Sequence, residues 1–442
     1  MKKYKYILKY IILFIAILIF NMLIVPTDLD EIWSYGFSIS MRNGLVPYRD
    51  FNMVVTPIYP FIISIFLFIF GKNILIFHII QALIITIMSS FLFKLIGNKS
   101  WLLLLIMFFP IPIFFPGYNI LLFFFLILLI YLEKEKYSDL IIGIVIGLSF
   151  LTKQSVGILF IIPSIIYYFK DIKKIGFRLL GFIIPNIIFL IYLLITNSFY
   201  KFIDLCFLGL FDFADSNGNI FSIYFFLMII ITIITIYYLY KNKKDINLLY
   251  ILMFYSVAVP MFDIKHFMEA FMGFVFIFLY YEKVKIKPEY AYFLLFSLIV
   301  IIQSIVIFND RINSKILYPN NIKYFEYRLI EKENIKITHD VNNFIDKNNY
   351  NKFIFLDSNS FYFKIINDHN IEYLDLLNTG NWGYNGTSKL LNEIKTKKDY
   401  VFFIDKEELK RGKQTDKMAI KYVMDNGKKI DSISFYDVYI LD

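Results

Sequence analysis

The chain has 442 residues, of which 58% are hydrophobic and only 18% are charged, and its mean hydropathy is +0.62. This composition excludes an ordinary water-soluble globular protein and is typical of a protein that crosses a membrane several times. The formal net charge is +9, and residues 1–308 account for +8 of it. An excess of Lys and Arg in this part is expected of the loops of a membrane protein, so the charge does not indicate nucleic-acid binding. The single cysteine, Cys206, excludes a disulfide framework within the chain.

Eleven apolar stretches predict membrane-spanning helices. The first follows a basic start and runs to about residue 25 with no cleavage site after it, which indicates an uncleaved first span. Several stretches are shorter than the roughly 20 residues that a bilayer core requires, so we expect their ends to extend into the flanking residues. The other ten are 74–95, 101–115, 120–132, 140–152, 156–169, 177–196, 220–240, 246–262, 267–281 and 290–308.

A further apolar segment, residues 57–71, decides the orientation of everything after it. If this segment does not cross, 18 Lys and Arg residues of the membrane part fall inside and six outside; if it crosses, the numbers become 8 and 16. Lys and Arg in short loops stay on the cytoplasmic side. We therefore predict eleven crossings with a cytoplasmic N-terminus. Residues 57–71 then form a re-entrant or interfacial helix within a large first external loop, residues 26–73.

This topology places residues 309–442 outside the cytoplasmic membrane, as a soluble domain separate from the membrane domain of residues 1–308. Helix-like patterns at 360–368, 388–397 and 415–426 alternate there with strand-like patterns at 352–357, 371–377, 399–405 and 432–442. Such alternation predicts a small α/β domain. The tail has no glycine-rich phosphate loop and no nucleophile elbow, so we expect acceptor binding or a scaffold role rather than a second enzyme.

The first external loop holds the strongest candidate site. It begins with three acids within four residues, Asp28, Asp30 and Glu31. The apolar periodicity that follows predicts a helix lying in the membrane interface. A carboxylate at the depth of lipid phosphates can take a proton from a hydroxyl, a task usually worth ~10²- to 10⁴-fold in rate. The alternative, that Asp28 or Asp30 only caps the helix, fits the pattern equally well.

The same loop resembles a known family. Its order of Asp-Glu, Tyr, Gly, Pro-Tyr, Asp and Pro in residues 30–57 is similar to the first external loop of the GT-C superfamily of membrane glycosyltransferases. That superfamily includes the bacterial aminoarabinose transferases and the protein O-mannosyltransferases of family 39. The resemblance covers about residues 1–310 and implies that Asp30 is the catalytic base with Glu31 beside it. Asp28, Tyr35 and Asp50 are then expected to belong to the substrate-binding loop.

A second stretch, GLSFLTKQSVGILFIIP at residues 147–163, is similar to a family segment at the outer end of the fifth span. The charge-derived topology places Lys153 at that same position. Lys153 and Gln154 are therefore predicted to bind the phosphate of a lipid-linked donor. The alternative is that Lys153 snorkels from a helix end. Relatives often carry a second acid between the third and fourth spans; Asn119 takes that place here, which argues against a two-acid or metal-assisted mechanism.

A polar cluster, Asp263, Lys265, His266 and Glu269, lies where the ninth and tenth spans meet the outer face. We predict that Lys265 and His266 bind the phosphate leaving group and that Glu269, one turn on, orients His266. Arg42 is a further phosphate candidate. The alternative is that the cluster pairs with itself. The histidines lack metal-ligand spacing, so we predict no metal site and no firm cofactor, with a divalent cation left open.

Together these features predict a hexosyl- or pentosyltransferase at the outer face of the cytoplasmic membrane. It would move a sugar from a polyprenyl-phosphate carrier to an envelope glycan, lipid or protein, with inversion at the anomeric carbon. A transporter or flippase of lipid-linked sugars is the alternative, and it would require polar residues at the membrane midplane. An envelope polymerase or ligase is a third interpretation.

Overall fold

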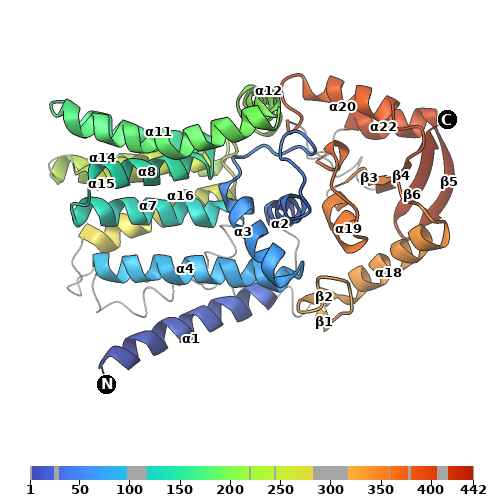
Figure 1. Cartoon of the computed structure of the whole chain (residues 1–442), viewed down its shortest axis with the longest axis horizontal. Helices are drawn as coiled ribbons and strands as arrows, with labels where there is room; N and C mark the ends of the chain where they lie inside the picture. Colours follow the sequence, from blue (N-terminus) through green and yellow to red (C-terminus); the bar gives the residue numbers. More distant parts are fainter. Residues whose placement is uncertain are drawn as a thin grey trace.

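The computed structural model describes residues 2–23, 29–96, 117–218, 221–242, 245–281, 317–357, 359–376, 380–405 and 417–441. A bundle of long helices forms one part of the molecule and a smaller α/β part forms the other (Figure 1). Helix α2 lies between the two parts. This arrangement encloses the start of the first external loop.

The bundle helices lie side by side along one direction (Figure 1). One of the predicted spans, residues 156–169, is made of three short pieces, α9 (Gln154–Gly157), η2 (Ile158–Phe160) and α10 (Ile161–Tyr167). The other helices are α1 (Lys2–Leu23), α4 (Ile74–Ile96), α7 (Tyr118–Lys134), α8 (Asp139–Phe150), α11 (Ile172–Ile195), α14 (Ile223–Lys241), α15 (Ile246–Phe254) continued by η4 (Tyr255–Ala258), and α16 (Ile264–Tyr281).

Three helices among the described residues are long and apolar enough to cross a membrane by themselves, namely α4, α11 and α14. The predicted number of about eleven spans is therefore not confirmed. One reason is that several of the predicted spans form short or interrupted helices, such as α8 with 12 residues. The predicted third and eleventh spans, residues 101–115 and 290–308, lie outside the described residues.

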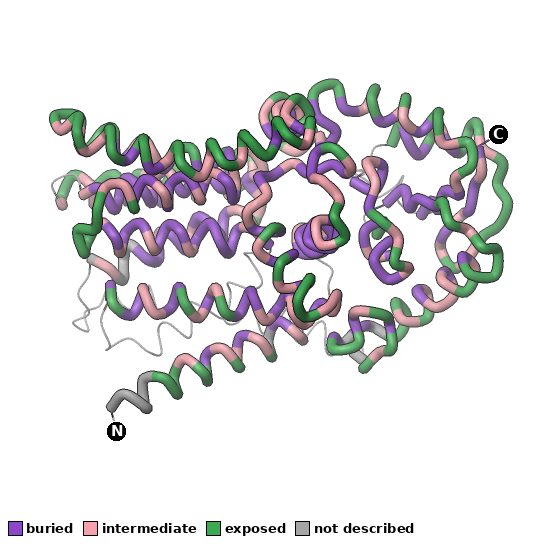
Figure 2. Tube along the Cα trace, viewed as in Figure 1, coloured by how far each residue is buried: buried purple, intermediate pink, exposed green. Residues whose placement is uncertain are grey.

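The outer surface of the bundle is apolar, as a surface facing lipid should be. Helix α11 exposes Ile188 at 66% and Ile195 at 76%, and both it and α14 are mostly exposed along their length (Figure 2). Basic side chains gather at the end of the bundle away from the α/β part: the Lys134 ammonium donates to the Leu95 carbonyl at 3.2 Å, beside Lys94. This grouping agrees with the charge pattern on which the topology rests.

The first external loop contributes α2 (Leu29–Arg42) and α3 (Ile58–Phe70), which pack against each other at the end of the bundle nearest the α/β part (Figure 1). Helix α3 is consistent with the expected helix that does not cross. Helix α2 differs from the expected interfacial helix, because residues 34–40 are all buried (Figure 2). The face of α2 that holds Gly36 packs on α19 of the C-terminal part instead of facing lipid. The contact is so close that a side chain at Gly36 would collide with Phe361 and Ile371.

Close packing of α8 on α11 positions the loop that follows α8. Hypothetical Cβ atoms at Gly143 and Gly181 would lie 2.1 and 2.2 Å from the backbone oxygens of Arg178 and Leu140. Small residues spaced in this way let two helices approach backbone to backbone within a membrane. The sharp break at the end of α8 then leads into Lys153, which precedes α9.

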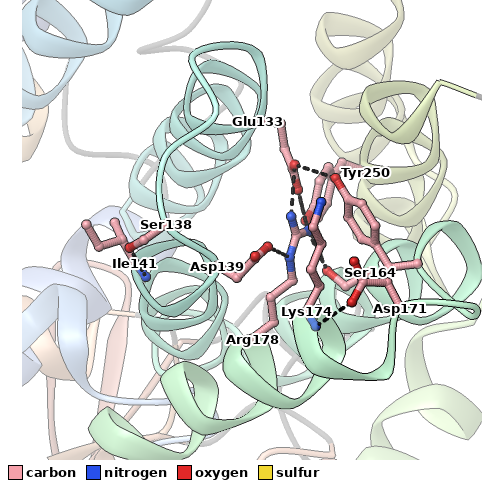
Figure 3. A network of polar contacts seen from close by, with 10 residues as sticks. Glu133, Ser138, Asp139, Ile141, Ser164, Asp171, Lys174, Arg178 and Tyr250 are labelled. Atoms are coloured by element: carbon pink, nitrogen blue, oxygen red, sulfur yellow. Dashed lines mark hydrogen bonds and ion pairs between the residues drawn. The ribbon is translucent and has the colours of Figure 1, made fainter.

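A polar network joins five helices at the opposite, basic end of the bundle (Figure 3). The buried Arg178 guanidinium donates to Glu133 Oε2 at 3.0 Å and to Asp139 Oδ1 at 2.8 Å. The Tyr250 hydroxyl donates to Glu133 Oε1 at 3.0 Å and lies 3.3 Å from the Ser164 hydroxyl. The buried charges on these helices pair with one another, so the network holds the helices together. It lies far from the α/β part.

We expect Tyr250→Phe to lower the free energy of unfolding by ~0.5–1.5 kcal/mol, because it removes the hydroxyl that donates to Glu133 while Arg178 remains paired. Thermal unfolding in detergent measures this effect. Tyr237→Phe on α14, where the side chain is 60% exposed, is the matched control and should change nothing. Equal stability of the two variants would contradict a clamping role for the network.

The C-terminal part is a four-stranded sheet in the order β3 (Phe353–Phe355), β4 (Val401–Asp405), β6 (Tyr436–Leu441) and β5 (Gly427–Ile433). Strand β4 is parallel to β3 and antiparallel to β6, which forms a hairpin with β5. The flanking helices are α18 (Lys332–Lys347), α19 (Ser360–Ile366), α20 (Gly386–Lys395) and α22 (Lys417–Asn426), and a short pair joins β1 (Leu317–Pro319) to β2 (Leu329–Glu331). The predicted small α/β unit is present.

Two details of the tail differ from the sequence prediction. Residues 371–377, expected to be a strand, contain the 3-10 helix η5 (Tyr373–Asp375), because the Asp375 carboxylate accepts from the Glu372 N–H at 2.7 Å and closes a capping box. The expected strand at 432–442 is instead divided by a turn, where Ser434 has a positive φ of 53°. The boundary predicted at residue 309 stays a prediction.

Candidate active site

A cavity of about 660 Å³ lies where the bundle meets α2 and the C-terminal part. Its size is that of a typical small-molecule site. Its charged lining is formed by Asp30, Lys153, Asp263, Lys265 and His266. These side chains come from distant parts of the sequence, and the fold brings together the two groups of candidates that were predicted separately.

Asp30 lies in the first turn of α2, where the partial positive charge of the helix N-terminus favours a carboxylate. The Lys265 ammonium donates to Asp30 Oδ2 at 2.9 Å. Burial of Asp30 acts to raise its pKa, but the charge and the hydrogen bond of Lys265 hold that pKa below the ordinary value of 3.8. Asp30 is therefore an ionised carboxylate at neutral pH, as a proton acceptor must be.

Lys265→Met should shift the acid limb of the activity profile to higher pH. Without the ammonium, burial is the dominant influence on Asp30, so its pKa rises and the carboxylate becomes protonated at a higher pH than in the wild type. The pH dependence of sugar transfer by the purified protein measures this shift. An acid limb that stays in place would show that Asp30 does not control the rate.

Lys153 is held by a series of hydrogen bonds that reaches from α7 to α16. Its ammonium donates to Asn119 Oδ1 at 3.3 Å, and Asn119 Nδ2 donates to Glu269 Oε1 at 2.7 Å. Burial lowers the pKa of Lys153 from its ordinary value of 10.5, although the nearby carboxylates of Glu269 and Asp30 oppose this. Asn119 thus links Lys153 to Glu269, which supplies a carboxylate from a different helix.

His266 also lines the cavity, but its partner differs from the one expected. The ring Nδ1 lies 2.9 Å from Asp263 Oδ1, whereas Glu269 binds Asn119. The hydrogen bond and charge of His266 lower the pKa of Asp263 in spite of its burial. Asp263, rather than Glu269, is therefore the residue that orients His266, because its carboxylate contacts the ring and also accepts a hydrogen bond from the His266 N–H at 2.9 Å.

Gln154 lines the cavity beside Lys153, with its amide already engaged. Nε2 donates to the carbonyl oxygens of Val54 and Cys206, each at 2.9 Å. Both N–H groups are used, so Gln154 has no donor for a phosphate. Its predicted role in phosphate binding does not match this geometry. The Oε1 atom is buried and has no hydrogen-bond partner among the described residues.

Glu31 lies one residue after Asp30 but does not line the cavity. It forms an ion pair with the fully buried Arg328 of the C-terminal part, and its Oε1 lies 3.2 Å from His78 Nε2. Against the effect of burial, these partners lower the pKa of Glu31 to about 2. The ion pair between Glu31 and Arg328 joins α2 to the C-terminal part. Glu31 and Asp30 therefore have different partners, although they are adjacent in the sequence.

The remaining candidates lie away from the cavity lining. Arg42 donates to the Leu67 carbonyl at 2.9 Å, and Asp50 pairs with Arg49 at 2.8 Å in an exposed turn. The Tyr35 hydroxyl donates to the Lys72 carbonyl, with its ring packed on Phe77. These contacts support loop structure. Asp28 lies outside the described residues.

The sequence predicted acceptor binding or a scaffold role for the C-terminal part but singled out none of its residues; the structure places Gly380 and Asn381 in the cavity wall. This loop docks on two acids of the bundle, Asp204 and Asp212. Asp204 Oδ1 accepts from the Tyr384 N–H and Asp212 Oδ2 from the Gly386 N–H, each at 3.1 Å. The glycine-rich pattern of residues 380–386 is the sequence feature that could have indicated a closely packed loop here.

Within the ranges that the structure describes, no three His, Cys, Asp or Glu side chains group in a way that could hold a metal ion. The cavity lining presents two carboxylates, Asp30 and Asp263, and three basic groups, Lys153, Lys265 and His266. Such a set can accept a proton at one point and stabilise an anion at another.

The comparisons with known proteins show the fold. No protein-family model matches the chain, and no curated protein matches it. Two solved structures do: ArnT from Cupriavidus metallidurans bound to undecaprenyl phosphate has a TM-score of 0.61 at 9% identity, over 98% of each chain. The same protein in the apo state has a TM-score of 0.55 at 10% identity, over 99% of this chain and 98% of that one. The chain therefore has the ArnT fold, as the loop resemblance predicted.

Proposed function

We propose that this protein is a membrane glycosyltransferase that takes a sugar from a polyprenyl-phosphate donor and gives it to a hydroxyl of a cell-envelope acceptor. The observation that carries this proposal is the cavity at the outer end of the bundle, lined by Asp30 and by Lys153, Lys265 and His266. The shared fold adds support for the carrier, since undecaprenyl phosphate is the molecule bound to ArnT.

In the proposed reaction, Asp30 accepts the proton of the acceptor hydroxyl. The oxygen attacks the anomeric carbon, and the bond from that carbon to the phosphate oxygen breaks. The polyprenyl phosphate leaves with the bonding electrons, so a single displacement inverts the configuration at the anomeric carbon. A general base of this kind contributes ~10²- to 10⁴-fold in rate.

The cations would stabilise the charge that develops on the leaving phosphate. Lys153 is positioned by Asn119 and His266 by Asp263, so both are oriented before substrate arrives. Lys265 would act twice. Before the reaction its ammonium keeps Asp30 ionised, and as negative charge grows on the leaving phosphate the ammonium would move from Asp30 to the phosphate. This exchange would make Asp30 a stronger base at the moment it is required.

Mass spectrometry of envelope glycans and polyprenyl-linked sugars in a deletion strain tests the proposal. We expect one sugar to be missing from the envelope and its polyprenyl-phosphate form to accumulate at the outer face, and the wild-type chain to reverse both changes. Accumulation of the donor at the cytoplasmic face would instead support a flippase. An unchanged set of glycans and lipids would refute transfer.

A further inference from the structure

Two residues of the cavity lining carry a buried amide oxygen that has no hydrogen-bond partner among the described residues. Gln154 is 3% exposed and Asn381 is 2% exposed, and both line the cavity. Neither Gln154 Oε1 nor Asn381 Oδ1 has a hydrogen-bond partner in the part of the chain that the structure describes. A buried acceptor without a donor is costly, and such groups in native proteins usually await a ligand or water.

The orientation of Gln154 is determined by its surroundings. Its Nε2 donates to two carbonyl oxygens, those of Val54 and Cys206. Rotating the amide by 180° would bring Oε1 against both carbonyls, so the unpartnered atom is the oxygen. Gln154 and Lys153, whose ammonium is the proposed phosphate ligand, both line the cavity.

The position of Asn381 is also set by the fold. The preceding Gly380 has a φ of +88° and approaches Phe213 of α13 (Gly209–Asn217) so closely that a Cβ would lie 2.5 Å from the Phe213 Cα. Gly383, with a φ of +77°, packs in the same way on Asp204. This packing holds the loop of residues 380–386 on the bundle. The C-terminal part thereby places Asn381 in the cavity wall.

The chemistry of these two atoms selects the ligand group. Both are acceptors, so they require a donor, and the phosphodiester of a sugar-loaded polyprenyl phosphate has none. Sugar hydroxyls are donors. Aromatic side chains that also line the cavity, Trp33 and Phe213, offer apolar surface beside them, which is the usual composition of a small-molecule site with a few placed polar groups.

We propose that Asn381, together with Gln154, determines specificity by accepting hydrogen bonds from hydroxyl groups of the donor sugar. This proposal rests on the proposed transferase function and deepens it, since it assigns the sugar side of the donor to these residues and the phosphate side to the cations. The C-terminal part then takes part directly in donor recognition, in addition to any scaffold role.

Native mass spectrometry of the purified full chain with two lipids tests the proposal. One probe is bare undecaprenyl phosphate, and the other is the sugar-loaded polyprenyl phosphate fraction extracted from the host. The wild type should prefer the sugar-loaded lipid. Asn381→Leu, which keeps the size but removes the acceptor, should weaken binding of the loaded lipid by ~3- to 10-fold and leave binding of the bare lipid unchanged.

The controls separate this role from a structural one. Asn348→Leu, at an exposed site after α18, should keep the wild-type preference. Asn381→Ala is a second variant that tests the same acceptor with a smaller side chain. The proposal is overturned if Asn381→Leu and Asn381→Ala keep the preference, lose binding of both lipids, or change only the KM for the acceptor. A wild-type chain that binds neither lipid would overturn the proposed function, and this proposal with it.

Discussion

Asp30→Asn should reduce sugar transfer by ~10²- to 10⁴-fold while the protein folds and inserts normally. The substitution keeps the shape of the side chain and removes its ability to accept a proton. Transfer is measured with the purified protein in liposomes, with the sugar-loaded polyprenyl phosphate fraction as donor and envelope extract as acceptor. Binding of undecaprenyl phosphate should persist, because the cations of the cavity remain.

Two comparisons make this test specific. Asp425→Asn removes a carboxylate from the exposed face of α22, far from the cavity, and should have no effect on the rate. Glu31→Gln alters the neighbouring acid, which pairs with Arg328 and does not line the cavity. We expect its effect to be a loss of stability. A Glu31→Gln variant that is stable and inactive, beside an active Asp30→Asn, would reverse the assignment of the base.

Arg328→Met should lower the free energy of unfolding by ~3–5 kcal/mol, because it leaves the Glu31 carboxylate buried without its main ionic partner. The C-terminal part should separate from α2 more readily. Thermal unfolding and limited proteolysis of the purified protein would detect both effects. A Tm and a cleavage pattern like those of the wild type would contradict the role of this pair.

The double variant Glu31→Leu/Arg328→Met provides the control, since replacing both partners of a buried pair by apolar groups is much less costly than removing one. It should recover most of the lost stability. The pair also predicts an acid limit. Because the pKa of Glu31 is lowered from 4.5 to about 2 in the folded protein, its stabilising contribution is fully present above pH 4.5 and is lost as the pH falls toward 2.

Much of the site could be predicted from sequence because its chemistry is local. Asp30 follows the first predicted span directly, and Lys153 stands at the break after α8, so charge counting and short motifs were enough to single out both as candidate site residues. Lys265 and His266 were found as a polar cluster at a helix start for the same reason.

Pairing between segments could not be predicted. The sequence puts Asp30 and Glu31 side by side, but successive residues of a helix point about 100° apart, so one faces the cavity and the other faces Arg328. Glu269 was expected beside His266 and instead binds Asn119 of α7. Which partner a buried side chain meets depends on helix rotation, and hydrophobic periodicity does not specify rotation among similar apolar helices.

The composition, the charge pattern and the loop motif by themselves determined a polytopic membrane protein with a small α/β tail and a candidate base at Asp30. The tertiary structure alone decided that α2 is enclosed and that Asn381 enters the cavity. The reason is that these features depend on long-range contacts: Phe361 and Ile371 pack against Gly36 of α2, and residues 380–386 dock onto Asp204 and Asp212, 180 and 174 residues earlier in the chain. Contacts of such long range arise only once both parts have folded and their surfaces meet.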